Sequence, residues 1–191
     1  MTSPASKTSL SLLDRLKDPA DRDAWVRLDR LYCGLLRAWF AAAGLQPADR
    51  DDLTQNALAV VLRQVKDFKH TGRPGSFRAW LRAIAANVLR EFWRARPAAQ
   101  ADSILAELGD PGSGLSRVWD AEHERHVLEG LLDLARPEFA DTTWRAFRRA
   151  GFDGVPARQV AVELGLTVNA VLIAKSRVLA RLRELAAGLL D

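Results

Sequence analysis

The side chains with the most evident chemistry lie near the C-terminal end of the chain, on a helix predicted to begin after Thr167. Thr167 has the hydroxyl that suits an N-terminal cap, and Asn169 and Ile173 follow on the outward face of the first turns. Lys175 and Arg177 come shortly after them. An amide and a branched apolar side chain can contact base edges in a groove, while cationic side chains can hold phosphates. The pattern predicts a surface that contacts DNA.

The segment before this helix predicts a shorter helix and a tight turn. Residues 155–164 have helical spacing, Gly165 supplies the turn, and the small side chain of Ala161 permits close approach of the two helices. This is the pattern of a helix-turn-helix, whose second helix lies in the major groove. On the second helix the residues predicted to face inward are Val168, Val171, Val178, Leu182, Leu185 and Leu189.

A second set of residues suited to nucleic acid lies on a helix predicted over residues 76–96. Arginine can hold phosphates, asparagine can read an adenine edge, and an exposed aromatic ring can stack on an unpaired base. The predicted outward face consists of Arg82, Ala86, Asn87, Arg90, Trp93 and Arg94, and the inward face of Phe77, Trp80, Leu81, Ile84, Val88 and Phe92. The preceding loop, residues 69–75, adds His70 and Arg73, and its Gly and Pro residues prevent a helix there.

A third surface is a polar stripe on a helix predicted over residues 49–68. It consists of Asp52, Gln55, Asn56, Ala59 and Arg63, opposite a broad apolar arc that includes Leu53, Ala57, Val61 and Leu62. The stripe is consistent with an ordinary solvated face. It is equally consistent with docking against helices of another protein, with Gln55 and Asn56 as hydrogen-bond anchors.

These surfaces must be positioned by helices, since apolar residues recur at helical spacing and alternating strand patterns are absent. Further helices are predicted over residues 8–18, 21–43, 119–135 and 138–150. The predicted fold is all-α, with two small helical domains: residues 1–96, a flexible acidic linker over 97–118 that allows the domains to rearrange, and residues 119–191 with the helix-turn-helix. Residues 63–96 carry nine Lys or Arg against Asp67 and Glu91, whereas residues 100–124 are predominantly acidic.

Composition excludes several classes of protein. Cys33 is the single cysteine, so an intramolecular disulfide is excluded and a reducing compartment is favoured. The N-terminus lacks the pattern of a signal peptide, and no apolar stretch approaches a membrane span, so we expect a cytoplasmic protein without membrane contact. No cofactor is expected. His123, His126 and Glu122 are close enough on a helix to suggest a metal site, but a third strong ligand is missing, so an enzyme is the weakest interpretation.

Three motifs in this order resemble bacterial RNA polymerase sigma factors of the extracytoplasmic-function class. The first is Asp51-Asp52-Leu53-Thr54-Gln55, and the second runs from Gly75 through Ser76-Phe77, Trp80-Leu81 and Ile84-Ala85 to Asn87. The third runs from Val160-Ala161 through Leu164-Gly165-Leu166-Thr167 to Arg181-Leu182. Together the motifs extend over nearly the whole chain.

The resemblance implies two partners, core RNA polymerase and promoter DNA, with an anti-sigma protein as a candidate third. The first motif would dock on the clamp helices of the largest polymerase subunit, through Asp52, Gln55, Asn56 and Arg63. The loop and helix after it would open and read the minus-ten element, and the helix-turn-helix would read the minus-thirty-five element. The acidic linker would thread the active-site and RNA-exit channels of the polymerase.

This sequence departs from the family pattern in two places. Asn56 stands where many relatives have an acidic residue, which predicts an altered clamp contact. Leu172 and Ala174 stand where relatives often have Lys or Arg, which predicts apolar contacts with thymine methyl groups. The alternative interpretation is a free-standing helix-turn-helix regulator that binds an operator without polymerase, but it leaves the polar stripe at 52–63 without a role.

Overall fold

The computed structural model describes residues 12–69, 75–96 and 98–186, with the side chains of residues 98–100 excepted. Within these residues the chain forms helices joined by turns and contains no strand, so the predicted all-α class is confirmed. Contacts between Cα atoms divide the chain into two compact units, the first extending to Gly130 and the second comprising Leu131–Ala186. His70, Arg73 and Leu189 lie outside the described residues.

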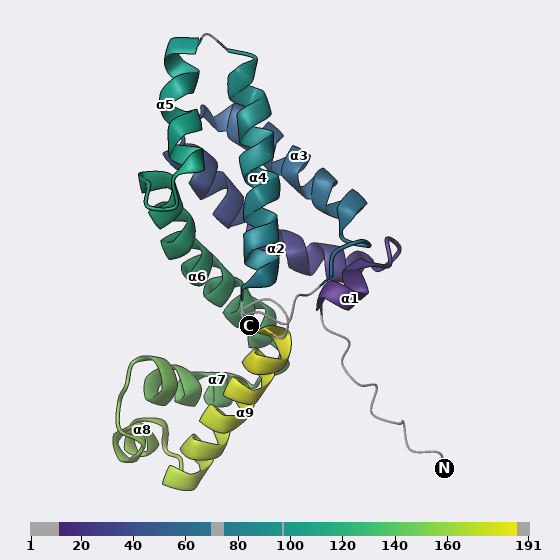
Figure 1. Ribbon diagram of the computed structural model, residues 1–191. Helices are drawn as coiled ribbons and strands as arrows, with labels where there is room; N and C mark the ends of the chain where they lie inside the picture. Colours follow the sequence, from purple (N-terminus) through teal and green to yellow (C-terminus); the bar gives the residue numbers. More distant parts are fainter. Residues whose placement is uncertain (1–11, 70–74, 97, 187–191) are drawn as a thin grey trace. The chain divides into compact units, whose positions relative to one another are not determined.

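The first unit is a bundle in which each helix from α1 to α5 packs on the next. Its helices are α1 (Leu12–Leu16), α2 (Arg22–Ala42), α3 (Pro47–Gln64), α4 (Ser76–Arg94), α5 (Ala98–Gly109) and most of α6 (Gly114–Ala135). Helix α2 packs on α3, α3 on α4, and α4 on α5 (Figure 1). The helices predicted to carry the polar stripe and the basic face, α3 and α4, are therefore neighbours in this bundle.

Local chemistry accounts for the ends of the long helices. Asp21 caps α2 by accepting a hydrogen bond from the Ala24 backbone N–H at 3.0 Å, and its carboxylate also accepts from Arg15 at 2.7 Å. Gly44, with φ of 81°, follows the end of α2. The cap of α4 is Gly75, with φ of 74°, so the helix itself begins at Ser76.

Residues 97–118 were expected to be a flexible linker, and the described part of this segment, residues 98–118, is largely helical. It contains α5 and the first turn of α6, joined by a turn in which the Asp110 carboxylate accepts a hydrogen bond from the Gly112 backbone N–H at 2.7 Å. The acidic and Gly-rich sequence thus forms a compact turn between two helices. The expected domain boundary at residue 96 differs from the division at Gly130, because α5 and most of α6 cluster with the first unit.

Helix α6 is anchored in the first unit by two tryptophans. The Trp39 indole N–H donates a hydrogen bond to the Leu115 carbonyl at 2.9 Å, and its ring meets the Trp119 ring edge-on, with 5.3 Å between centroids. Both side chains are almost completely buried. Glycines permit this close approach, since a Cβ on Gly130 would lie only 2.9 Å from Cδ2 of Leu31.

The second unit begins with the last turn of α6 and continues through short helices to a long one. These are the 3-10 turn η1 (Arg136–Glu138), α7 (Asp141–Phe147), the π-helical turn η2 (Arg148–Phe152), α8 (Ala157–Leu164) and α9 (Val168–Ala186). Its core contains Ala146, Phe147, Val160, Ala161, Val171 and Val178. Gly165, with φ of 65°, ends α8, and the Thr167 hydroxyl caps α9 by accepting from the Ala170 backbone N–H at 3.1 Å.

Helices α8 and α9 are related by a bend of 105° at the turn between them. Among the described residues no single helix has both the length and the hydropathy of a membrane span, and α8 and α9 reach that composition only as this bent pair.

Candidate nucleic-acid interface

The polar stripe on α3 faces outward in the structure. Asp52, Gln55, Asn56, Ala59 and Arg63 are all exposed, while Leu53, Ala57 and Val61 on the opposite face are buried. One expectation is wrong: Leu62, assigned to the apolar arc, is 43% exposed. Leu62 therefore adds one partly exposed apolar side chain beside the exposed amides of Gln55 and Asn56.

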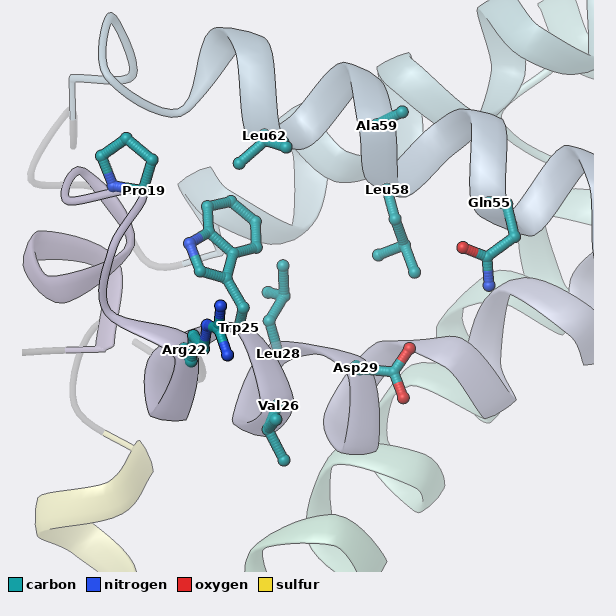
Figure 2. A pocket seen from close by; sticks show the side chains of 10 residues that line it. All are labelled: Pro19, Arg22, Trp25, Val26, Leu28, Asp29, Gln55, Leu58, Ala59 and Leu62. Atoms are coloured by element: carbon teal, nitrogen blue, oxygen red, sulfur yellow. The ribbon is translucent and has the colours of Figure 1, made fainter.

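A groove of about 570 Å³ lies beside the stripe, between α2 and α3. Figure 2 shows the Trp25 and Leu62 side chains at one end of it and Gln55 at the other, with the Leu28 and Leu58 side chains between. Arg22 and Asp29 add one charge of each sign along the α2 side. Such a groove can accept an apolar side chain while the polar groups around it fix the orientation of the partner.

The outward face of α4 is only partly exposed. Asn87 and Arg94 are exposed, and Arg90 is half-buried and donates a hydrogen bond to the Asn87 side-chain oxygen at 2.6 Å. This bond holds the Asn87 amide in one orientation, with its NH₂ group available to an acceptor. Asn87 and Arg90 thus form a small polar pair that can contact a base edge and a phosphate together.

Trp93 does not point outward as predicted. It is 9% exposed, and Ala86 on the same face is 7% exposed, because α5 packs against this side of α4. Phe92, predicted to face inward, is half-buried, with the Arg96 guanidinium 3.3 Å from the centre of its ring. In this arrangement Trp93 is a packing residue, and its indole N–H is buried without a hydrogen-bond partner.

Two arginines of α4 are engaged by α6. Arg82 donates a hydrogen bond to the Ser116 hydroxyl, and Arg78 pairs with the Asp120 carboxylate. Arg78 was not among the predicted residues, although it lies one turn before Arg82 and therefore on the same face. The two guanidinium groups extend the basic face of α4. Each already has a partner, a hydroxyl group for Arg82 and a carboxylate for Arg78.

Aromatic rings gather at the N-terminal end of α4. Trp80 lies 4.9 Å from Phe68 and 5.5 Å from Phe77, measured between ring centroids. A hollow beside them is lined by Gln64, Asp67, Phe68, Lys69, Ser76 and Trp80. Aromatic walls with polar groups between them can stack on an unpaired base and hydrogen-bond its edges.

In the second unit, α9 presents the predicted reading residues to solvent. Thr167, Asn169 and Arg177 are exposed, and Ile173 and Leu172 are about half exposed, at 49% and 51%. Two orientations differ from expectation. Ala174 is 7% exposed within the core between α8 and α9, so it is not placed to meet thymine methyl groups, and Val168, predicted to face inward, is 39% exposed.

Lys175 and Arg149 link α8 and α9 to the turn before them. The Lys175 ammonium group lies 3.5 Å from the Ala150 carbonyl, which directs it along the core edge. Arg149, which sequence reasoning did not single out, donates two hydrogen bonds of 3.1 Å to Glu163 on α8 and one of 3.1 Å to Asp153. The hydrogen bond from Arg149 lowers the pKa of the Glu163 carboxyl. Arg149 therefore fixes the orientation of α8.

The histidines of α6 point into different surroundings. His123 is buried against the Tyr32 ring, with 6.0 Å between centroids, whereas His126 is half-buried and its Nδ1 lies 3.0 Å from the Glu122 carbonyl oxygen. No group of three His, Cys, Asp or Glu side chains with the geometry of a metal site occurs among the described residues.

Comparison with known proteins gives one match. Residues 27–97 match the family model for Sigma-70 region 2, a segment that runs from α2 through α4 and stops before α5. No curated protein and no solved structure matches the chain. The matched segment is therefore similar to region 2 of sigma factors.

Proposed function

We propose that this protein is a sigma factor of the extracytoplasmic-function class, which binds core RNA polymerase and directs it to promoters through its two units. The observation that carries the proposal is the region 2 match across α2, α3 and α4, where an exposed polar stripe and groove lie on one side and a basic helix on another. Neither α4 nor α9 needs strong affinity for DNA alone, because linkage through polymerase raises the effective concentration at which each helix meets the promoter.

Within this function α4 contacts the minus-ten element. Asn87, Arg90 and Arg94 supply its base and phosphate contacts, and the hollow around Phe68 and Trp80 offers stacking surfaces for an unpaired base. His70 and Arg73 in the preceding loop are proposed as further contacts. In the second unit α8 and α9 form the helix-turn-helix that contacts the minus-thirty-five element.

The direct test is transcription in vitro with purified core polymerase and a library of promoter fragments. A sigma factor produces transcripts that begin at defined positions and that core polymerase alone does not produce. A free-standing regulator would instead bind an operator tightly without polymerase and would not restore initiation. The two outcomes exclude one another, so the experiment separates the two functions.

The first prediction concerns the polymerase interface on α3. Replacing Gln55 and Asn56 by Ala should weaken binding of core polymerase by about tenfold or more, as expected when interface anchors are truncated. Titration of labelled protein with core polymerase measures this change. Gln46→Ala is the matched control, because Gln46 is exposed just before α3 and makes no side-chain capping bond. Equal affinity for the double variant and the control would remove this face from the interface.

The second prediction concerns the recognition residues of α9. Exchanging Asn169 and Ile173 for other side chains should change the upstream sequence that is preferred, because both are exposed early on the helix. Arg177→Ala should instead weaken all sequences alike and reduce the salt dependence, as a phosphate contact does. Selection from a randomised upstream library measures both effects. An unchanged preference in the Asn169/Ile173 variant would show that α9 is only structural.

A further inference from the structure

The outward face of α9 is largely apolar in the turns where a recognition helix meets DNA. Its exposed side chains there include Asn169, Leu172 and Ile173, whereas Val171 and Ala174 are buried in the core formed with α8. Leu172 and Ile173 are neighbours in the chain, and each is about half exposed. Large apolar side chains that are exposed next to one another mark a surface for contact with another molecule.

The cationic side chains of α8 and α9 lie at the margins of this face. Within residues 168–176 the one cation is Lys175, whose ammonium group is directed along the core edge toward the Ala150 carbonyl. Arg177 is exposed further along α9, and Arg158 is exposed at the start of α8. These arginines are placed for phosphates, which leaves the base edges to neutral side chains. Guanine is most often read by a bidentate Arg or Lys, and the apolar face offers neither.

The charges around the apolar face favour DNA as the molecule that it contacts. The exposed Glu163 carboxylate on α8 accepts two hydrogen bonds of 3.1 Å from Arg149, so its negative charge is compensated within the protein. Asp153 is paired with the same guanidinium group at 3.1 Å. Arg158 and Arg177 therefore give the flanks of the face a positive character, which complements a phosphate backbone on either side of a groove.

The side chains on the face match one pair of bases. In the major groove thymine alone offers an apolar group, its 5-methyl, and adenine offers the donor and acceptor that an asparagine amide can pair with. Ile173 is branched at Cβ and holds essentially one conformation in a helix. Leucine and isoleucine also lose less conformational entropy on contact than lysine or arginine. Leu172 and Ile173 are thus suited to methyl groups, and Asn169 to an adenine edge.

We propose that α9 selects its DNA element through the 5-methyl groups of thymine, which contact Leu172 and Ile173, with Asn169 on a neighbouring adenine. The minus-thirty-five element of this protein then consists of A·T pairs at the positions below these side chains. Arg158 and Arg177 hold the phosphates and add no sequence preference. This inference rests on the proposed function, because it specifies the base chemistry that the minus-thirty-five contact recognises.

The first test changes the DNA and leaves the protein as it is. The probe is a promoter duplex with the upstream element selected from the randomised library, bound by holoenzyme assembled with core polymerase at fixed salt. Uracil in place of thymine keeps the O4 acceptor and lacks only the methyl group. We expect a loss of about fourfold in affinity for each contacted methyl, the effect of one apolar carbon no longer buried.

The matched control duplex has the same number of uracils in the spacer between the two promoter elements, and it should bind as the unmodified duplex does. The proposal is overturned by a selected element that contains no thymine below α9. It is equally overturned if the uracil and thymine forms of the element bind alike.

A second change of the DNA separates the methyl group from the hydrogen-bonding groups of the base. Replacing a contacted T·A pair by C·G should weaken binding, because the thymine methyl and the partner adenine are both lost. Cytosine methylated at C5 places a methyl group at the same point of the groove, so it should recover about fourfold in affinity. Equal binding of the two cytosine duplexes would contradict recognition of the methyl group.

The protein variants assign the contact to particular side chains. Leu172→Ala with Ile173→Ala should bind the thymine and uracil duplexes equally, and both positions are exposed, so the fold is retained. Leu128→Ala, at a position 40% exposed on α6, is the matched control and should keep the full preference for thymine. A double variant that keeps this preference overturns the assignment, since other side chains would then contact the methyl groups.

Two further outcomes distinguish this inference from its alternatives. If thymine and uracil bind alike in the wild type and the double variant binds core polymerase more weakly, the apolar face is a protein interface and the proposal is wrong. Failure of promoter-dependent transcription would instead overturn the proposed function. The same duplexes titrated with the free protein would then still measure whether binding depends on the methyl groups, so the two failures are distinguishable.

Discussion

Trp39→Ala is expected to lower the free energy of unfolding by about 3–5 kcal/mol, the range for removing a large aromatic side chain from a packed core. Trp39 is fully buried, contacts the Trp119 and Phe40 rings, and donates to the Leu115 carbonyl from 76 positions away in the sequence. Its removal opens a cavity and leaves a buried carbonyl without its donor. Urea unfolding followed by circular dichroism at neutral pH measures the loss.

Two further variants separate packing from the hydrogen bond. Trp39→Phe keeps most of the ring but lacks the N–H, so it should cost about 1–3 kcal/mol, the penalty for one unsatisfied buried group together with some lost volume. Val26→Ala changes an exposed side chain and should alter stability by less than about 0.5 kcal/mol. A Trp39→Ala protein as stable as Val26→Ala would show that α6 is not anchored through this contact.

The helices that carry the candidate sites were predictable because each has a strong local signal. The boundaries of α2 follow from the Asp21 cap and Gly44, and the start of α9 follows from Thr167. The polar stripe on α3 was also predictable, since a helical wheel needs only one buried face to identify the opposite one. These signals are contained in a few neighbouring residues.

The orientation of Trp93 could not be obtained in the same way. A helical-wheel projection assumes that a helix packs against the protein with one face only. Helix α4 instead packs on α3 with one side and on α5 with another. Predicting that the Trp93 side chain is buried required knowing that residues 98–109 form a helix. The Pro, Gly and acidic residues around that segment favoured a linker instead. A sequence signal for the α2–α6 packing does exist, because Gly34 and Gly130 are small residues inside helices, as close approach requires.

The last prediction concerns acid stability and depends on His123. Its side chain is almost fully buried, and both ring nitrogens lack hydrogen-bond partners. The groups around it are Tyr32 from α2, Arg78 from α4 and Asp120 from α6. Burial lowers the pKa of His123 to about 4, the Arg78 cation acts in the same direction, and the Asp120 carboxylate acts against them.

Because the pKa of His123 is lowered on folding, the unfolded chain binds the proton more readily than the folded protein does. Above the unfolded pKa of 6.5 both states are neutral at this position and stability is not affected. Between pH 6.5 and about 4 the unfolded state gains protons that the folded state does not, so stability falls as the pH falls. The loss approaches about 3 kcal/mol at the acid end of this range, from 1.36 kcal/mol for each pKa unit.

His123→Leu should remove this part of the pH dependence. Urea unfolding at pH 7 and at pH 4.5 gives, for each protein, the decrease in the free energy of unfolding between the two pH values. The contributions of the carboxyl groups to this decrease cancel when the wild type is compared with the variant. Leu128→Gln, at an exposed position on the same helix, is the matched control and should show the same fall in stability between pH 7 and pH 4.5 as the wild type. An identical loss in His123→Leu and the wild type would show that the imidazole is not buried in the neutral form. A smaller loss in His123→Leu alone would place His123 in the core between α2, α4 and α6, because only a desolvated imidazole resists protonation in this range.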